Sequence, residues 1–265
     1  MSLAGVRHVV VVSSGKGGVG KSTVTTNLAV CLARSGKRVG VLDADVYGPD
    51  IPIMFGVSKP PVIANNRIQP PEEHGVKLMS LGFLVDPEQA VIWRGPMVMQ
   101  ALDQMMNQVE WGELDILLVD MPPGTGDAQL TMTQKVPLSG AILVSTPQAV
   151  ALADTIKGLA MFRKVETPIL GMVENMSEFL CPHCGQASEF FRRGTVVEAC
   201  RHYEVPYLGD VPFDPACREG ADRGLPITVS QPGSPVGQAF RAIADRILEA
   251  MPEPAAPIPI VRRAE

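Results

Sequence analysis

Residues 8–23 read HVVVVSSGKGGVGKST and combine a short apolar run with a glycine-rich turn that carries two lysines. The β-branched run 8–12 is typical of a strand that is buried on both faces. From Gly15 to Ser22 the chain satisfies the phosphate-binding pattern G-x-x-x-x-G-K-[S/T], and the segment 21–35 has the apolar spacing of a helix. A strand, a glycine-rich turn and a helix in this order predict a nucleotide-binding α/β fold.

The remainder of the chain continues this alternation of strands and helices. We expect strands at 38–45, 115–127, 140–147, 168–176 and 205–212, and helices at 149–164 and 236–251. Such a pattern implies βαβ units, and therefore a doubly wound, mostly parallel sheet with helices on both faces. We expect one domain over residues 1–251, with an insertion of loops and a short edge strand at 46–91 and a projecting metal-binding loop at about 177–200. The Pro-rich tail 252–265 is expected to be disordered.

Composition and charge exclude several classes of partner. Of the 265 residues, 46% are hydrophobic and the net charge is −5, without a long basic run. This acidic balance argues against nucleic-acid binding. No apolar stretch approaches the roughly 20 residues needed to cross a bilayer, and the first predicted strand begins too early to leave room for a signal peptide. We therefore expect a cytoplasmic protein with neither nucleic acid nor membrane as a partner.

The glycine-rich turn indicates how a nucleotide would be held. Its backbone N–H groups and the following helix N-terminus favour phosphate. Lys21 would neutralise the β- and γ-phosphate oxygens, and Ser22 would ligate Mg²⁺. A glycine-rich turn with a chance lysine is the alternative interpretation.

Carboxylates follow two of the predicted strands. Asp120 is expected beside the Mg²⁺ ion, outside its direct ligands, and Asp45 is expected to orient or deprotonate the attacking water. Asp43 ends the same strand as Asp45. Capping of the following loops is the alternative role for these side chains. In the PPGTGD loop after Asp120, Gly124 would donate its N–H to the γ-phosphate.

The five cysteines, at positions 31, 181, 184, 200 and 217, are expected to be reduced thiols, because their number is odd and no export signal is present. Cys181 and Cys184 form the turn CPHCG, whose spacing lets two thiolates converge on one metal ion or cluster. Zinc and cubane clusters take four ligands, so two are missing. A second chain could supply them, or Cys200 and Cys217 could, and a structural or redox pair is the third alternative. The helical spacing around Cys200 predicts an inert buried thiol, and His183 is expected to be a solvent-facing spacer.

The motifs KGGVGKST, DADVYGPDIP and DMPPGTGD, in this order, resemble those of the deviant Walker A class of P-loop NTPases. More narrowly, they are similar to the Mrp/ApbC/Nbp group of iron–sulfur cluster carrier ATPases, from about residue 7 to about residue 250. The resemblance implies an ATP-hydrolysing homodimer in which Lys16 reaches the nucleotide of the partner. It also implies that Cys181 and Cys184 bridge a labile [4Fe–4S] cluster, which is passed to apo-proteins. The adenine site would lie at Asn175 and at the loop 212–214.

Two other functions share parts of this pattern: a partitioning or positioning switch ATPase, and a zinc-stabilised, nucleotide-dependent regulator. The candidate catalytic residues are Lys16, Lys21, Asp45 and Asp120. The candidate nucleotide contacts are Gly15, Lys16, Gly17, Gly18, Val19, Gly20, Lys21, Ser22, Thr23, Asp43, Gly124, Asn175, Pro212 and Asp214. Mg²⁺ is assigned to Ser22 and Asp120, and the cluster, or zinc in its place, to Cys181 and Cys184.

Overall fold

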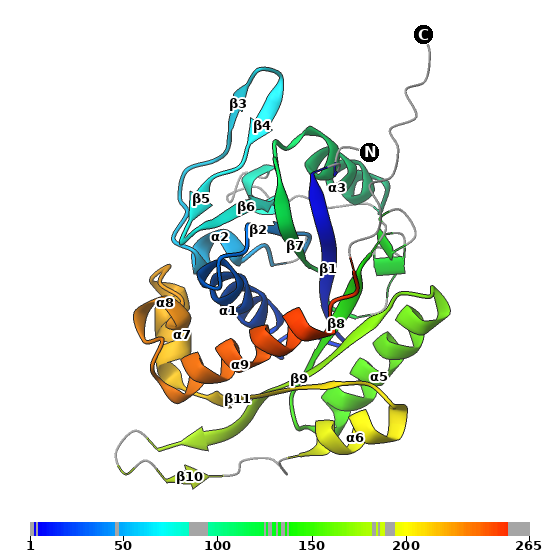
Figure 1. Ribbon diagram of the computed structural model, residues 1–265, viewed down its shortest axis with the longest axis vertical. Coiled ribbons are helices and arrows are strands. Elements are labelled where there is room, and N and C mark those ends of the chain that lie inside the picture. The colour runs from blue at the N-terminus through cyan, green and yellow to red at the C-terminus, as the bar shows by residue number, and fades with distance from the viewer. Residues whose placement is uncertain are drawn as a thin grey trace.

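The computed structural model is built on a nine-stranded sheet with helices on both faces (Figure 1). The structure describes residues 3, 5–45, 48–84, 95–124, 126, 129–130, 132–133, 136, 138–181, 184, 186–188 and 194–253. His183 and positions 254–265 of the predicted tail therefore lie outside the described residues. Among the helices that are described, none is long and apolar enough to cross a membrane.

The sheet is mostly parallel. Its strands are β1 (Val6–Ser14), β2 (Val39–Asp43), β5 (Glu72–Glu73), β6 (Val76–Ser80), β7 (Leu114–Asp120), β8 (Gly140–Ser145), β9 (Ile169–Leu180), β10 (Ala187–Ser188) and β11 (Tyr207–Phe213). They follow the order β10-β9-β8-β1-β7-β2-β6-β5, with β11 also paired to β9. Only the two-residue strands β5 and β10 pair in antiparallel fashion within this sheet. The doubly wound fold predicted from the sequence is confirmed.

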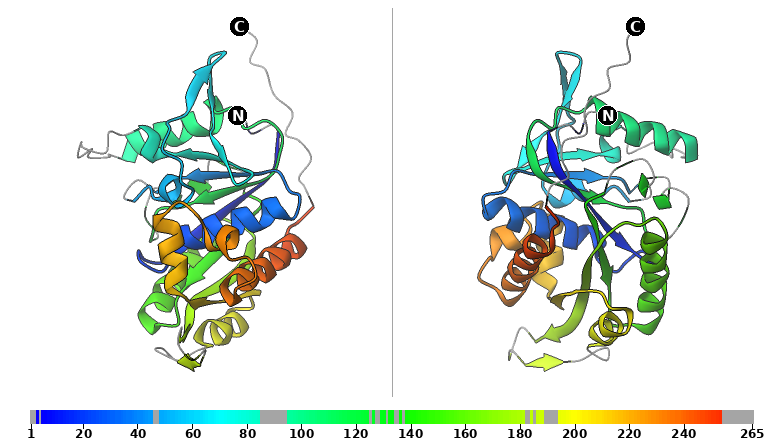
Figure 2. Two further views of the ribbon diagram at one scale, coloured as in Figure 1. Left: turned by 90° about the vertical axis from the view of Figure 1, so that its left-hand side faces the viewer. Right: turned by 45° about the vertical axis from the view of Figure 1, so that its right-hand side comes forward.

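The helices are α1 (Lys21–Arg34), α2 (Ile51–Met54), α3 (Gly95–Gln108), α5 (Ala149–Lys164), α6 (Thr195–Tyr203), α7 (Pro215–Asp222), α8 (Ile227–Ser230) and α9 (Pro235–Ala250). Figure 2 shows α1 and α9 on one face of the sheet and α3 and α5 on the other. Strand β1 is buried on both sides, since Val10 and Val12 pack into one hydrophobic cluster and Val9 and Val11 into the other. The continuous apolar run of β1 reflects this double burial.

Residues 48–84, the described part of the segment 46–91, contain more regular structure than the sequence predicts. They include α2, the hairpin of β3 (Val62–Ala64) and β4 (Arg67–Gln69), the two strands β5 and β6, and the 3₁₀ turn Leu81–Leu84. The expected short edge strand is β5, which lies at the end of the sheet, and β6 pairs with β2 along five residues inside it. Val76 and Met79 pack on opposite faces of the sheet, which explains why so short a strand is stable there.

The range 177–200, expected as a projecting loop, contains regular structure among its described residues. Strand β9 continues to Leu180, β10 pairs back onto it, and α6 begins at Thr195. The strand predicted over 115–127 ends at Asp120, as the proline pair that follows would require. Strands β1, β2 and β7 run parallel, so their carboxyl ends meet at one edge of the sheet, where ligands bind in open α/β folds.

Candidate nucleotide site and cysteine hairpin

The turn between β1 and α1 has the properties of an anion cradle. Gly20, with a φ of 83°, caps α1 in a left-handed conformation that favours glycine, and no side chain caps the helix. The first turn also lacks acidic residues, which leaves its N–H groups and their positive potential for an anion. A Cβ atom added at Gly17 or Gly18 would have no heavy atom within 4 Å, so the backbone there is open to a ligand.

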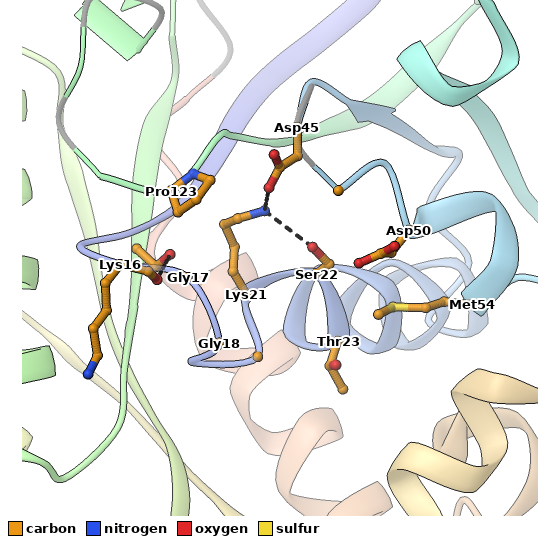
Figure 3. Close-up of a pocket in the computed structure, with 13 residues that line it drawn as sticks. Lys16, Gly17, Gly18, Lys21, Ser22, Thr23, Asp45, Asp50, Met54 and Pro123 are labelled. Atoms are coloured by element: carbon orange, nitrogen blue, oxygen red, sulfur yellow. Dashed lines mark hydrogen bonds and ion pairs between the residues drawn. The ribbon is translucent and has the colours of Figure 1, made fainter. Parts of the chain in front are cut away.

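Lys21 lies at the centre of a polar cluster at this edge of the sheet (Figure 3). Its Nζ atom is 2.5 Å from Asp120 Oδ2, 3.2 Å from Ser22 Oγ and 3.4 Å from Asp45 Oδ2. Ser22 Oγ donates to the same Asp120 oxygen at 2.6 Å, and Thr25 Oγ1 donates to the other oxygen at 2.6 Å. The structure thus brings together the residues assigned to phosphate, Mg²⁺ and water.

The charges of this cluster shift each other's pKa values. Burial would lower the pKa of Lys21, but the charge and hydrogen bond of Asp120, together with Asp45 and Asp43, outweigh burial and raise it. Burial raises the pKa of Asp43 well above its usual value, and the neighbouring charge of Asp120 raises it further. Lys21 is therefore a permanent cation that offsets the repulsion among three carboxylates.

The structure gives Asp43 and Asp45 different surroundings. Asp43 is fully buried and accepts hydrogen bonds from Ser80 Oγ at 2.8 Å and from the backbone N–H groups of Asp45 and Ile51. These bonds hold the loop after β2, which is the capping role considered above. Asp45 instead lines the pocket over the glycine-rich turn.

This pocket contains most of the predicted phosphate contacts and five residues that the sequence prediction missed, namely Ser14, Gly48, Asp50, Met54 and Pro123. It is lined by Ser14, Lys16, Gly17, Gly18, Gly20, Lys21, Ser22, Thr23, Asp45, Gly48, Asp50, Met54 and Pro123. Gly48, Asp50 and Met54 belong to the segment that follows Asp45. Asp50 was detectable in the motif DADVYGPDIP as a further carboxylate on the same loop. Figure 3 shows its carboxylate directed towards the hydroxyl of Ser22.

The side chains of Lys16 and Lys21 point in different directions. In Figure 3 the Lys16 side chain points away from both Lys21 and Asp45, although its backbone lines the same pocket. The Lys16 carbonyl accepts a hydrogen bond from Ser14 Oγ at 3.0 Å, which fixes the turn beneath it. The ammonium group of Lys16 is thus directed away from the pocket over its own glycine-rich turn.

Several predicted nucleotide contacts are engaged within the protein and do not line this pocket. The Gly124 N–H group, assigned to the γ-phosphate, donates to the Ser14 carbonyl at 2.9 Å. Asn175 Nδ2 donates to the Val19 carbonyl at 2.8 Å and so supports the glycine-rich turn from below. Asp214 caps α7 by accepting from the Ala216 N–H group. Asn175 of β9 pairs with Val211 of the adjacent strand β11, and the loop 212–214 spans the end of β11 and the start of α7, so the assignment of these residues to adenine stays a prediction.

Cys181 and Cys184 lie at the tip of a hairpin formed by the end of β9 and β10. The Cys181 N–H group donates to the Gln186 carbonyl at 3.0 Å, and this bond closes the turn. Cys184 is exposed and Cys181 half-buried. Figure 1 shows the end of β9 and β10 projecting beyond the helices. In the described parts of the chain, no group of three His, Cys, Asp or Glu side chains could hold a metal ion, so a third ligand to this pair is not found among them.

The other three thiols have different surroundings. Burial raises the pKa of Cys31, Cys200 and Cys217 to about 11 in each case. Cys200 is buried on the apolar side of α6 with Val196, as predicted. Burial of this kind is typical of inert structural thiols, since the surroundings disfavour the reactive thiolate form.

Strand, glycine-rich turn, helix and converging carboxylates define a P-loop nucleotide-binding protein. The model of the ParA group described as NUBPL iron-transfer P-loop NTPase matches residues 5–248. The chain belongs to this family.

Known proteins of similar sequence and structure agree with this assignment. The iron-sulfur protein required for NADH dehydrogenase, mitochondrial, of Arabidopsis thaliana is 49% identical over 96% of this chain and 82% of its own length. The iron-sulfur cluster carrier protein of Synechocystis is 50% identical over 93% of this chain and 71% of its own length. The nucleotide-binding protein of Archaeoglobus fulgidus, solved in complex with ADP, superposes with a TM-score of 0.78 at 38% identity, covering 90% of this chain and 93% of that one.

Proposed function

We propose that this protein is an ATP-hydrolysing iron–sulfur cluster carrier, which holds a labile [4Fe–4S] cluster between two copies of the chain and transfers it to apo-proteins. The observation that carries the proposal is the pair of the half-buried Cys181 and the exposed Cys184 at a hairpin tip on a P-loop NTPase. Two thiolates with no third ligand among the described residues fit a site that is shared between chains. Relatives at about half identity are named for this cargo.

The pocket suits ATP because it contains the positive charge of Lys21 and an open glycine-rich backbone. Phosphate oxygens would replace carboxylates around Lys21, whose three N–H donors face Asp120, Asp45 and Ser22. Ser22 and Asp120 together would hold Mg²⁺, which stabilises the charge that develops during phosphoryl transfer. Asp45 lines the pocket and would position the attacking water.

Lys16 supports the proposal of a homodimer. Its side chain is directed away from its own site, so its charge is placed to contact a phosphate in a facing copy. A dimer would thereby complete each nucleotide site, while the paired hairpins would complete the cluster site with two plus two cysteines. ATP binding and cluster binding would then both favour association of the chains.

Anaerobic reconstitution with iron and sulfide tests this function. We expect an absorption band at about 400 nm from thiolate-to-iron charge transfer, and its loss in the double variant Cys181→Ser/Cys184→Ser. The variant Cys217→Ser is the control, because it removes a buried thiol outside the hairpin. A wild-type protein that retains zinc and forms no chromophore would instead support the zinc-stabilised regulator.

A further inference from the structure

Strand β9 passes directly beneath the phosphate-binding turn. Asn175 Nδ2 donates to the Val19 carbonyl, and a Cβ atom added at Gly20 would lie only 2.2 Å from the same nitrogen. The turn therefore rests in van der Waals contact on the Asn175 side chain. Any displacement of Val19 or Gly20 on phosphate binding has to be transmitted to this residue, because close-packed groups have no free space between them.

The preceding residue of the same strand holds the start of helix α6. Glu174 is buried, with 1% of its surface exposed. Its Oε1 atom accepts from the Gly194 N–H group at 3.2 Å, and its Oε2 atom accepts from the Val196 N–H group at 3.0 Å. Gly194 offers no capping side chain to α6, so Glu174 supplies the cap from another part of the chain.

Both ends of the cysteine segment are thus fixed to one short stretch of β9. The outgoing end runs from Asn175 through Met176, which has a φ of 56°, to Phe179, and the register against β11 shifts in this stretch. Phe179 packs against Phe213 of β11, with 6.1 Å between the ring centroids. The returning end is the start of α6, where Glu174 binds. Adjacent residues of a strand project to opposite faces of the sheet. Asn175 therefore contacts the glycine-rich turn on one side of β9, and Glu174 contacts the start of α6 on the other.

We propose that Glu174 is a positioning residue that couples nucleotide binding to the geometry of the cysteine hairpin. Phosphate binding shifts the glycine-rich turn, Asn175 carries the shift into β9, and Glu174 passes it to the start of α6. The inference rests on the proposed function, because it assigns to this strand the coupling between ATP and cluster.

Hydrogen exchange of the peptide 194–203 tests the coupling without any cluster. We expect Mg²⁺ and a non-hydrolysable ATP analogue to slow exchange in the wild-type peptide by about ten-fold, a coupling of ordinary size. In Glu174→Gln one acceptor becomes an N–H donor, which faces the N–H group of either Gly194 or Val196, and the response should fall below about two-fold. Nucleotide affinity of this variant, measured by calorimetry, should remain within about three-fold of wild type, since Glu174 does not line the pocket.

Glu198→Gln is the matched control, since Glu198 lies exposed in the first turn of the same helix. It removes the same charge near the helix N-terminus and should keep the ten-fold response. A Glu174→Gln protein that binds nucleotide and keeps the full response would overturn the inference. So would a wild-type peptide 194–203 that does not respond, and this measurement needs no variant.

The two proposals fail in different ways. If the wild-type protein takes up no cluster but the peptide responds through Glu174, the carrier function is wrong and the conformational link stands. If a cluster forms and its release rate depends on nucleotide equally in wild type and Glu174→Gln, the function stands and the coupling route is wrong.

Discussion

Lys21 is the side chain on which the phosphate site depends most. It is 6% exposed and faces carboxylates of Asp120 and Asp45, with Asp43 behind them. Removing a partner from a buried ion pair leaves uncompensated charge, which costs far more than losing an exposed ion pair. We therefore expect Lys21 to contribute both to the stability of the fold and to the affinity for nucleotide.

We expect Lys21→Met to lower the free energy of unfolding by about 3–5 kcal/mol at neutral pH, as for other broken buried pairs. Urea unfolding measures this change. Lys16→Met is the control, since Lys16 is only half-buried in the same turn, and its effect should stay within about 0.5 kcal/mol. Equal effects of the two substitutions would mean that the carboxylate cluster does not need the Lys21 charge.

The loss of stability caused by Lys21→Met should become smaller as the pH falls. Burial and the charge of Asp120 raise the pKa of Asp43, while Lys21 opposes this shift. A carboxyl whose pKa is raised in the folded state binds protons on folding, so stability rises as the pH falls through that raised pKa. Without Lys21 the pKa of Asp43 in the folded state is raised further, so the free energy of unfolding depends more steeply on pH. Unfolding measured from pH about 8 to about 5 should show the two proteins converging towards acid.

Substitutions of the two lysines of the turn should affect nucleotide binding and hydrolysis differently. Lys21→Ala removes the charge that faces the terminal phosphates, and we expect at least about a hundred-fold loss of ATP affinity. Lys16→Ala should retain affinity within about ten-fold and lose hydrolysis, because its ammonium group points out of its own site. Calorimetry and phosphate release measure the two properties. Equal loss of affinity in both variants would refute the role across the dimer.

Asp45→Asn should bind Mg·ATP and hydrolyse it about 10²- to 10⁴-fold more slowly, as expected when a group that positions or deprotonates water is lost. Asn keeps the size of the side chain and a hydrogen-bonding oxygen. Single-turnover phosphate release measures the chemical step. Asp50→Asn is the useful comparison, since Asp50 lines the same pocket, and a larger loss there would transfer the role to that residue.

At the scale of elements, the hairpin of β9 and β10 separates two cysteines from the other three. Cys31, Cys200 and Cys217 lie on packed helices, and burial raises each pKa to about 11. We expect Cys181→Ser or Cys184→Ser to abolish cluster binding, and serine at any of the other three positions to leave it intact. Iron and sulfide analysis after anaerobic reconstitution measures the difference. Loss of the cluster in Cys200→Ser or Cys217→Ser would return that residue to the ligand set.

Elements with strong local signals could be predicted from the sequence. The apolar run of β1 and the pattern around Lys21 each need only neighbouring residues to be recognised. Strand β6 is not predicted from the sequence, because its five residues are stabilised by pairing with β2, more than thirty positions earlier in the chain. Helix α3, which packs its Met105 and Leu102 into the core, was missed altogether. The supports of the site, such as Asn175 under Val19 and Glu174 at α6, are tertiary contacts that no local pattern contains.

At the scale of the whole molecule, the sheet places the two sites at different locations. The nucleotide pocket lies at the carboxyl ends of β1, β2 and β7, and the cysteine hairpin extends from the far side of the sheet beyond β8. A dimer that joins both sites would have two contact regions. Each ligand would then stabilise the association that the other requires, and by linkage the effect must be reciprocal.

The stoichiometry of the cluster tests the central proposal of a carrier with a shared site most directly. Iron and sulfide contents should be measured on one reconstituted sample together with its native mass. We predict four irons and four sulfides per two chains, since each chain supplies two of the four thiolates that a cubane takes, and dissociation towards monomers when the cluster is removed without ATP. A stable monomer that carries a full complement of metal would contradict the proposal.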